Sequence, residues 1–125
     1  MLAYAMVGTN DKQKAIAFYD ALFEVIGAKQ LFSTDRSVFW GFDMGQPMFG
    51  VGDPFDGEDA CLGNGCMTCI GAPSKEVVDK FYAKALELGG TDEGEPGPRA
   101  DGAIYTGYFR DLDGNKLNIA AFPPF

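Results

Sequence analysis

Few residues in this chain could do chemistry. The 125 residues include no histidine, which removes the commonest general base and the commonest transition-metal ligand. Three thiols remain, at Cys61, Cys66 and Cys69. Cys66 and Cys69 stand three positions apart in a predicted strand, where side chains point to opposite faces, and Cys61 alone cannot complete a tetrahedral site. We therefore expect the cysteines to be small buried side chains, with Cys69 the one thiol able to contact a ligand.

Residues 111–115 (DLDGN) carry the most calcium-like spacing of acidic side chains. An EF-hand loop needs glycine at its sixth position and glutamate at its twelfth. Here Gly114 is fourth and Phe122 is twelfth. We interpret the segment as a hairpin turn between two strands.

Two arginines are candidate contacts for an anion. We expect Arg110 to pair with Asp111 or Asp113 and so to belong to the turn. Arg99 lies in a segment rich in glycine and proline, where it could gate a binding site.

An internal repeat supplies the elements that must position these residues. Residues 7–28 and 70–91 align at an offset of 63 without a gap. Chance would give roughly one or two identities in such a window. Six positions are identical: Gly8/Gly71, Lys12/Lys75, Phe18/Phe81, Tyr19/Tyr82, Glu24/Glu87 and Gly27/Gly90. In each copy a strand is predicted to end at a glycine, and a helix follows that ends at another glycine.

The first predicted helix shows how each copy is built. Asn10 is the expected N-cap, and Gln13 completes a capping-box pattern. Gly27 is the expected stop. The apolar positions follow helical spacing: Ala15, Phe18, Tyr19, Leu22 and Ile26.

Strand patterns complete two similar units, each in the order βαβββ. Strands are predicted at 2–8, 29–33, 38–43 and 47–52 in the first unit, and at 65–71, 104–110 and 116–122 in the second, with a short or irregular strand inside 91–101. We expect one domain, with a first module at 1–52, a linker and candidate flap at 53–64, and a second module at 65–125.

Composition excludes several classes of partner. A net charge of −8 argues against a nucleic acid, and no apolar run approaches the roughly 20 residues that cross a membrane. The first residues lack a basic segment, so no signal peptide is predicted and a cytoplasmic location is expected. An odd number of cysteines fits reduced thiols.

Three segments together carry a resemblance to a known family. They are residues 7–28, residues 64–90 (NGCMTCIGAPSKEVVDKFYAKALELGG) and residues 110–119 (RDLDGNKLNI). The chain resembles the vicinal oxygen chelate superfamily, which includes glyoxalase I, bleomycin-resistance proteins and extradiol dioxygenases. The resemblance implies an α+β fold in which two tandem βαβββ modules form a cupped, half-barrel mixed sheet with two main helices outside. It also implies a homodimer.

Enzymes of that family hold a divalent cation with ligands from the first and fourth strands of each module. The 63-residue offset carries Tyr4 onto Met67, and aligning the closing hairpins places Phe49 against Asn118. None of the four is a histidine or glutamate, and together they cannot hold such a cation tightly. We therefore expect no cofactor, with a metal only at an unconventional site.

The same four positions could line a ligand pocket, with Asn118 as its polar group. The alternative is that the cup is filled and these side chains are ordinary core. Trp40 is equally open to interpretation as a pocket wall or as core. The candidate ligand-binding residues are Tyr4, Trp40, Phe49, Met67, Cys69, Tyr105 and Asn118.

Three functions fit these observations. The favoured one is a small-molecule binder that works without the family's metal. A second is a metal-dependent enzyme of the glyoxalase, lyase or dioxygenase type with unrecognised ligands. A third is a non-catalytic dimeric interaction module.

Overall fold

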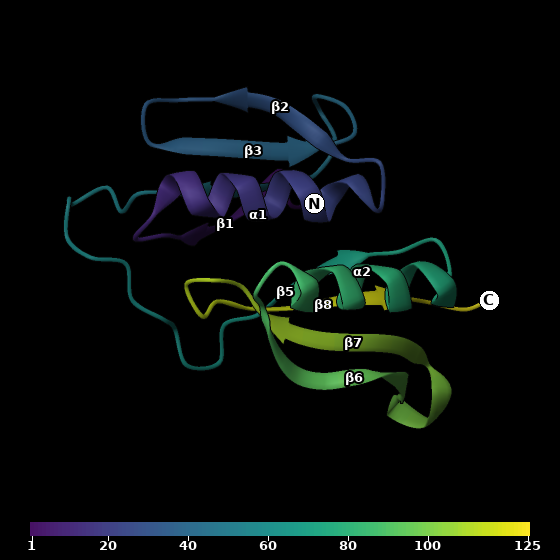
Figure 1. The fold of residues 1–125 in the computed structure, drawn as a ribbon. Coiled ribbons are helices and arrows are strands. Elements are labelled where there is room, and N and C mark those ends of the chain that lie inside the picture. Colours follow the sequence, from purple (N-terminus) through teal and green to yellow (C-terminus); the bar gives the residue numbers. More distant parts are fainter.

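The computed structural model describes residues 1–125 as two βαβββ modules (Figure 1). Module 1 contains β1 (Tyr4–Gly8), α1 (Lys12–Glu24), β2 (Lys29–Ser33), β3 (Ser37–Gly41) and β4 (Met48–Gly52). Module 2 contains β5 (Thr68–Gly71), α2 (Lys75–Glu87), β6 (Thr91–Arg99), the short 3₁₀ helix η1 (Ala100–Gly102), β7 (Ile104–Arg110) and β8 (Lys116–Ala121). The two helices keep the 63-residue offset at both ends. The α+β fold with tandem βαβββ modules is confirmed.

The eight strands form two four-stranded sheets with matching order, β1-β4-β3-β2 and β5-β8-β7-β6. In each module the first strand is parallel to the last, and the remaining pairs are antiparallel. The first strand of each module therefore stands at a sheet end with one edge unpaired. These two free edges belong to β1 and β5.

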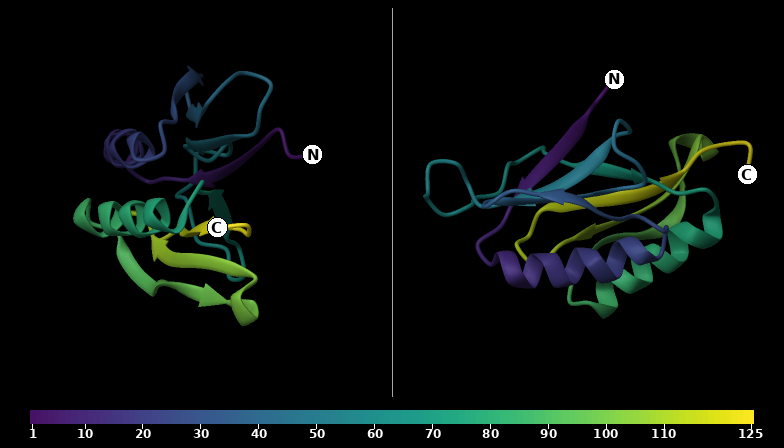
Figure 2. Two further views of the ribbon diagram at one scale, coloured as in Figure 1. Left: turned by 90° about the vertical axis from the view of Figure 1, so that its right-hand side faces the viewer. Right: turned by 90° about the horizontal axis from the view of Figure 1, so that it is seen from above.

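Both helices lie on one side of the molecule, next to each other (Figures 1 and 2). Each covers one face of its own sheet. A single hydrophobic core of 18 buried residues runs through both modules, and the rings of Phe23 on α1 and Phe81 on α2 meet in it at 6.1 Å between centroids. The opposite face of each sheet is covered by no helix (Figure 2).

The start of α1 differs from the sequence expectation. Asp11 is the N-cap, and its side chain accepts a hydrogen bond from the Lys14 backbone N–H at 3.2 Å. Asn10 instead binds the linker, because its amide bonds both the N–H and the C=O of Ala60, at 2.7 and 3.1 Å. At the other end, Gly27 adopts φ = 78°, as its predicted role as a stop requires.

Several strand boundaries also differ. β5 begins at Thr68 and not at residue 65, because Cys66 lies in a turn whose N–H donates to the Gly63 carbonyl. β6 runs for nine residues, longer than expected, although two register shifts interrupt its pairing with β7. The strand is therefore irregular, as one of the two expected forms, and it is not short.

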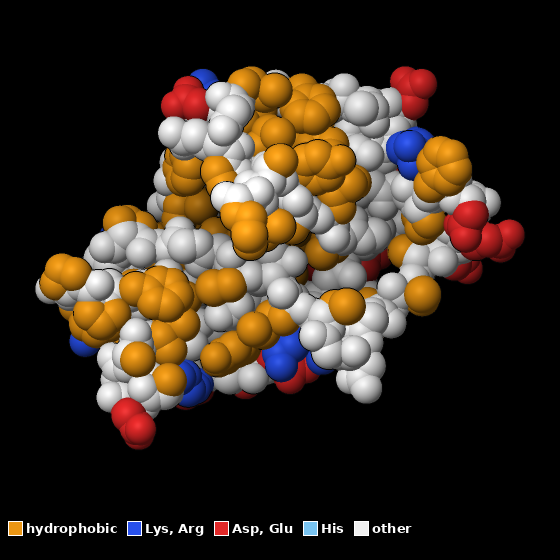
Figure 3. Space-filling view, turned by 180° about the vertical axis from the view of Figure 1, so that it is seen from behind, with side chains coloured by type: hydrophobic (Ala, Val, Ile, Leu, Met, Phe, Trp, Pro, Cys, Tyr) orange, Lys and Arg blue, Asp and Glu red, His pale blue; other side chains and the backbone are white.

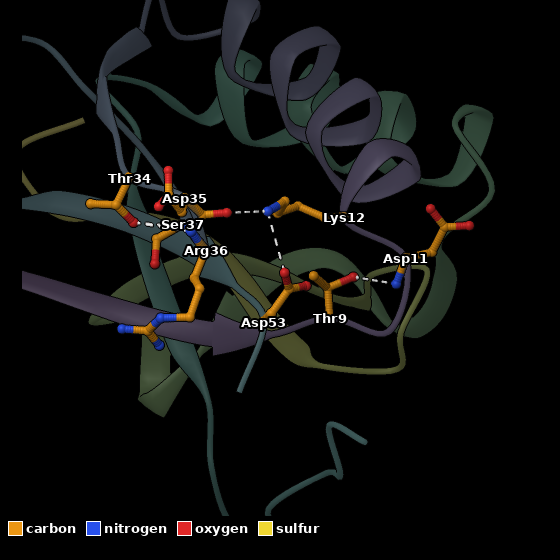
Figure 4. Close-up of polar contacts among 8 residues, drawn as sticks. All are labelled: Thr9, Asp11, Lys12, Thr34, Asp35, Arg36, Ser37 and Asp53. Carbon is orange, nitrogen blue, oxygen red and sulfur yellow. Dashed lines mark hydrogen bonds and ion pairs between the residues drawn. The ribbon is translucent and has the colours of Figure 1, made fainter. Parts of the chain in front are cut away.

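A polar cluster closes one end of module 1 (Figure 4). The Lys12 ammonium in the first turn of α1 donates to the Asp35 carbonyl at 2.6 Å and pairs with the Asp53 carboxylate at 3.3 Å. The Asp53 N–H in turn donates to the Arg36 carbonyl. The helix start, the β2–β3 turn and the exit from β4 are thereby held together where the linker begins.

Side-chain hydrogen bonds join the two modules near the β7–β8 turn. The Tyr19 hydroxyl donates to the Asp111 carboxylate at 2.6 Å, and the Asn115 amide donates to the Gly8 carbonyl at 2.9 Å. Burial raises the pKa of both Tyr19 and Asp111. The turn at residues 111–115 is confirmed, with the Asp111 N–H donating to the Asn115 carbonyl.

None of the helices combines the length and the apolar character that crossing a bilayer would require.

Candidate ligand-binding seam

The strand register decides which side chains share a face in module 1. Tyr4 lies opposite Met48, and Ala5 lies opposite Phe49. Phe49 therefore points toward α1, where its ring meets Tyr19 at 4.9 Å. Tyr4 points to the other side, which we call the open face. Tyr4 and Phe49 therefore project from opposite faces of the sheet, because a register difference of one residue reverses the face of a side chain.

In module 2 the open face carries Cys69, Tyr108 and Asn118, which are opposite one another across β5, β7 and β8. Asn118 is buried, and its amide N–H donates to the Thr106 hydroxyl at 3.0 Å. That hydroxyl donates its own proton to the Ile119 carbonyl at 2.8 Å, which fixes the orientation of the Asn118 amide. The Asn118 Oδ1 is left without a partner.

Tyr105 does not join this group. Its ring packs against the core on the helix side of module 2, and its hydroxyl donates to Asp79 on α2 at 2.8 Å. It lines none of the cavities described below. Tyr105 and Asn118, both candidate ligand-binding residues, thus project from opposite faces of the β7–β8 ladder.

Other expectations about reactive side chains also need correction. All three cysteines are exposed, since Cys61 and Cys66 lie outside strands and Cys69 lies at an uncovered edge. Arg110 pairs with Glu93 on the neighbouring strand β6 at 2.6 Å, and not with the acidic side chains of its own turn. Arg99 bonds two carbonyls of its own strand and lies over the Tyr108 ring.

A cavity of about 350 Å³ lies between the free edges of β1 and β5. We call the line along which these edges face each other the seam, and this cavity its apolar end. Most of its lining is hydrophobic. Its walls include Tyr4 and Ala5 from β1, Met48 and Phe49 from β4, Trp40 from β3, Phe23 and Ile26 near the end of α1, and Thr68, Cys69, Ile70 and Gly71 from β5.

Four of the predicted ligand-binding residues meet in this cavity: Tyr4, Trp40, Phe49 and Cys69. Their role in binding stays a prediction. Trp40 proves to be core and wall at once, since it is 1% exposed and still borders the cavity. The sequence reasoning missed the contribution of Phe23 and Ile26. Helical spacing marked Ile26 as a core position and did not single out Phe23, and only the packing of α1 against the sheet end brings both to the cavity.

A smaller hollow of about 70 Å³ continues the seam. It is lined by Met6 and Val7 from β1 and by Thr68, which also borders the apolar end. Met67 lies here and not in the larger cavity. The remaining walls include Arg110, Asn115 and Lys116. We call this hollow the polar end of the seam.

The open face exposes large apolar side chains. Tyr4, Met6 and Met67 are each between 43% and 50% exposed. Seen from the side away from the helices, apolar atoms cover much of the molecule (Figure 3). An uncovered apolar surface of this kind commonly contacts a ligand or another protein.

The residues of the open face do not fit a divalent cation. It presents Tyr4 and Met6 on β1, Met67 just before β5 and Cys69 on β5, and on the fourth strands Met48, Gly50, Lys116 and Asn118. This set contains no imidazole and no carboxylate, which are the ligands that such cations prefer. Nowhere do three His, Cys, Asp or Glu side chains gather in a way that could hold a metal.

Comparison with known proteins places the chain in a family. A sequence model of the Glyoxalase/Bleomycin resistance protein/Dioxygenase superfamily matches residues 1–119. The chain belongs to this superfamily.

Solved structures agree with that placement. A glyoxalase/bleomycin resistance protein from Albidiferax ferrireducens T118 is 35% identical, with a TM-score of 0.89 over 98% of this chain and 99% of that one. A lactoylglutathione lyase from Agrobacterium tumefaciens is 21% identical, with a TM-score of 0.68 over 97% and 92% of the two chains, and shows the shared fold. No functionally curated protein matches the chain.

Proposed function

We propose that this protein binds a small, largely apolar molecule in the seam, without the divalent metal that enzymes of its family use. The observation that carries the proposal is the cavity of about 350 Å³ between β1 and β5, which lies within the size range of small-molecule sites. Its lining offers aromatic and thioether surface and no cluster of metal ligands.

The residues around the cavity have separate parts in binding. Trp40 and Phe49 form a rigid wall, because both rings are held by packing against Phe23 and Tyr19 of α1. Met48 contributes a flexible thioether that adapts to the shape of the ligand. Transfer of the ligand from water to this lining supplies the main driving force, at about 25 cal/mol per Å² of apolar surface buried.

Trp40 makes the proposal directly testable, because it is the single tryptophan of the chain and borders the cavity. We expect its fluorescence to change, with saturation, when 4-phenylbutan-1-ol is titrated into the protein. A linear, unsaturable response would contradict binding at a defined site.

Gly71 offers a way to block the cavity. It lines the cavity, its φ is not in the left-handed region, and an added Cβ would meet no atom within 4 Å. Gly71→Leu should therefore fill the space and abolish the fluorescence response while the protein stays folded by circular dichroism. Ala83→Leu on the exposed side of α2 is the matched control and should bind as the natural protein does.

A metal-dependent enzyme is the alternative function, and the family of the chain favours it. Metal analysis of the purified protein separates the two. We expect no metal in stoichiometric amount. One equivalent of nickel, zinc, iron or manganese per chain would contradict the present proposal and support the metal-dependent enzyme.

The homodimer is also a proposal. The exposed apolar side chains Tyr4, Met6 and Met67 on the open faces support it, because a sheet normally buries its apolar face against another layer. Sedimentation equilibrium should give twice the mass of the chain, and Met6→Lys should shift it toward the monomer. A mass that stays that of the monomer at all concentrations would contradict a homodimer formed through the open faces.

A further inference from the structure

The two ends of the seam differ in chemistry, although they are parts of one continuous feature. Thr68 borders both cavities. Along β1, Tyr4 and Ala5 border the apolar end while Met6 and Val7 border the polar end. Only the polar end contains charged side chains, which are Arg110 and Lys116.

The strand geometry sets the distance between the two ends. The three steps from Tyr4 to Val7 cover about 10 Å at the rise of an extended strand. A molecule that reaches from the apolar end to the polar end therefore needs a body of that length. An aromatic ring with a chain of three or four carbons has it.

The polar end holds positive charge that the protein itself does not fully neutralise. Arg110 and Lys116 lie directly opposite each other on β7 and β8, a placement that is unfavourable for like charges. Glu93 pairs with Arg110 at 2.6 Å, but Lys116 forms no ion pair. Lys116 is also half-buried, and its ammonium lies over the Tyr108 ring, 5.7 Å from the ring centroid.

This positive charge contrasts with the net charge of −8 of the whole protein, which disfavours anions overall. The polar end is a local exception where an anionic group would relieve the repulsion between Lys116 and Arg110. A neutral or cationic group would not.

We infer that the ligand of the seam is an amphipathic organic anion, with its apolar body in the cavity beside Trp40 and its carboxylate, or an equivalent anionic group, against Lys116. This inference rests on the proposed function, because it assigns a chemical class to the molecule bound in the same seam.

The test compares two probes that share one skeleton, 4-phenylbutyrate and 4-phenylbutan-1-ol, by Trp40 fluorescence. The natural protein should bind the carboxylate about tenfold more tightly than the alcohol, the ratio typical of one charge-assisted contact. That preference should shrink as salt is added, because the contact is partly exposed.

Substitutions of Lys116 test whether this residue causes the preference for the carboxylate over the alcohol. Lys116→Gln should lower the affinity for the carboxylate to that for the alcohol and leave the affinity for the alcohol unchanged, which also shows that the variant is folded. Lys116→Arg should retain the preference. Lys80→Gln, at an exposed position on α2, makes the same change of charge away from the seam and should have no effect.

The outcomes distinguish the two proposals. Equal affinity of the natural protein for both probes would overturn the anion preference and leave the small-molecule site in place. Binding of neither probe would overturn the proposed site itself. A preference that survives Lys116→Gln would assign the anion contact to another residue and so contradict the inference.

Discussion

The carboxylate of Asp111 accepts hydrogen bonds from both modules. One oxygen receives the Tyr19 hydroxyl of α1 and the Asn115 amide, and the other receives the N–H groups of Asp113 and Asn115. These bonds favour the charged form, but burial outweighs them and raises the pKa of Asp111. The residue therefore stabilises the fold in a pH-dependent way.

The sign of that dependence follows from the direction of the shift. An acid whose pKa is higher in the folded state than in the unfolded chain, where it is about 3.9, binds its proton more tightly when folded. Its contribution is fully present below the unfolded pKa and is lost as the pH rises through the folded pKa. The natural protein should thus lose stability relative to Asp111→Asn as the pH rises from about 4 toward neutrality.

Urea unfolding of both proteins across this pH range measures the difference. The raised pKa would be contradicted if the difference in unfolding free energy between the natural protein and Asp111→Asn stayed constant with pH. It would also be contradicted if the natural protein gained stability relative to the variant as the pH rises. Asp59→Asn in the exposed linker serves as the control for a general change of charge.

At the residue scale, the sequence predicted where a residue lies in the fold better than the sheet face from which its side chain projects. The repeat predicted equivalent positions for Tyr4 and Met67, and both lie at the seam, although Met67 comes just before β5. The faces of Phe49 and Tyr105 could not be derived from the strand pattern, because the face depends on strand register. Register is set by turn lengths and side-chain packing, which a strand pattern by itself does not contain.

At the scale of elements, the end of α1 depends on one backbone conformation. Gly27 has φ = 78°, and an added Cβ would meet no atom within 4 Å. The cost of Gly27→Ala is therefore purely conformational and should be about 1 kcal/mol of unfolding free energy. Chemical denaturation measures it.

Gly71→Ala is the matched control for that substitution. Gly71 has equal space around its Cβ position but a backbone that any residue can adopt. The Gly71→Ala variant should therefore keep the unfolding free energy of the natural protein. Equal losses at both positions would show that the cost does not arise from the left-handed backbone.

The elements themselves were largely predictable, because each rests on a local signal. Ser74 caps α2 with a bond to the Val77 N–H, and β7 begins and ends where its pattern predicted. The cap of α1 was misplaced by one residue. Asn10 and Asp11 are both good caps, and the choice between them is made by the contact of Asn10 with Ala60, 50 residues away.

At the scale of the whole molecule, the shared core predicts that the two modules unfold together. Phe81 of module 2 is fully buried and meets Phe23 of module 1, whereas Trp40 reports on module 1 alone. Phe81→Ala should cost about 3–5 kcal/mol. The unfolding midpoints measured by Trp40 fluorescence and by circular dichroism should fall by the same amount. A Trp40 transition that stays in place would show that the modules unfold separately.

The seam described above belongs to neither module. Module 1 provides the aromatic wall with Trp40 and Phe49, and module 2 provides the cations Arg110 and Lys116. The polar half of ligand recognition can therefore change independently of the apolar half, since Arg110 and Lys116 lie outside the shared core. A chimera that joins module 1 of this chain to module 2 of a relative should keep the apolar half of its specificity and acquire a new polar half.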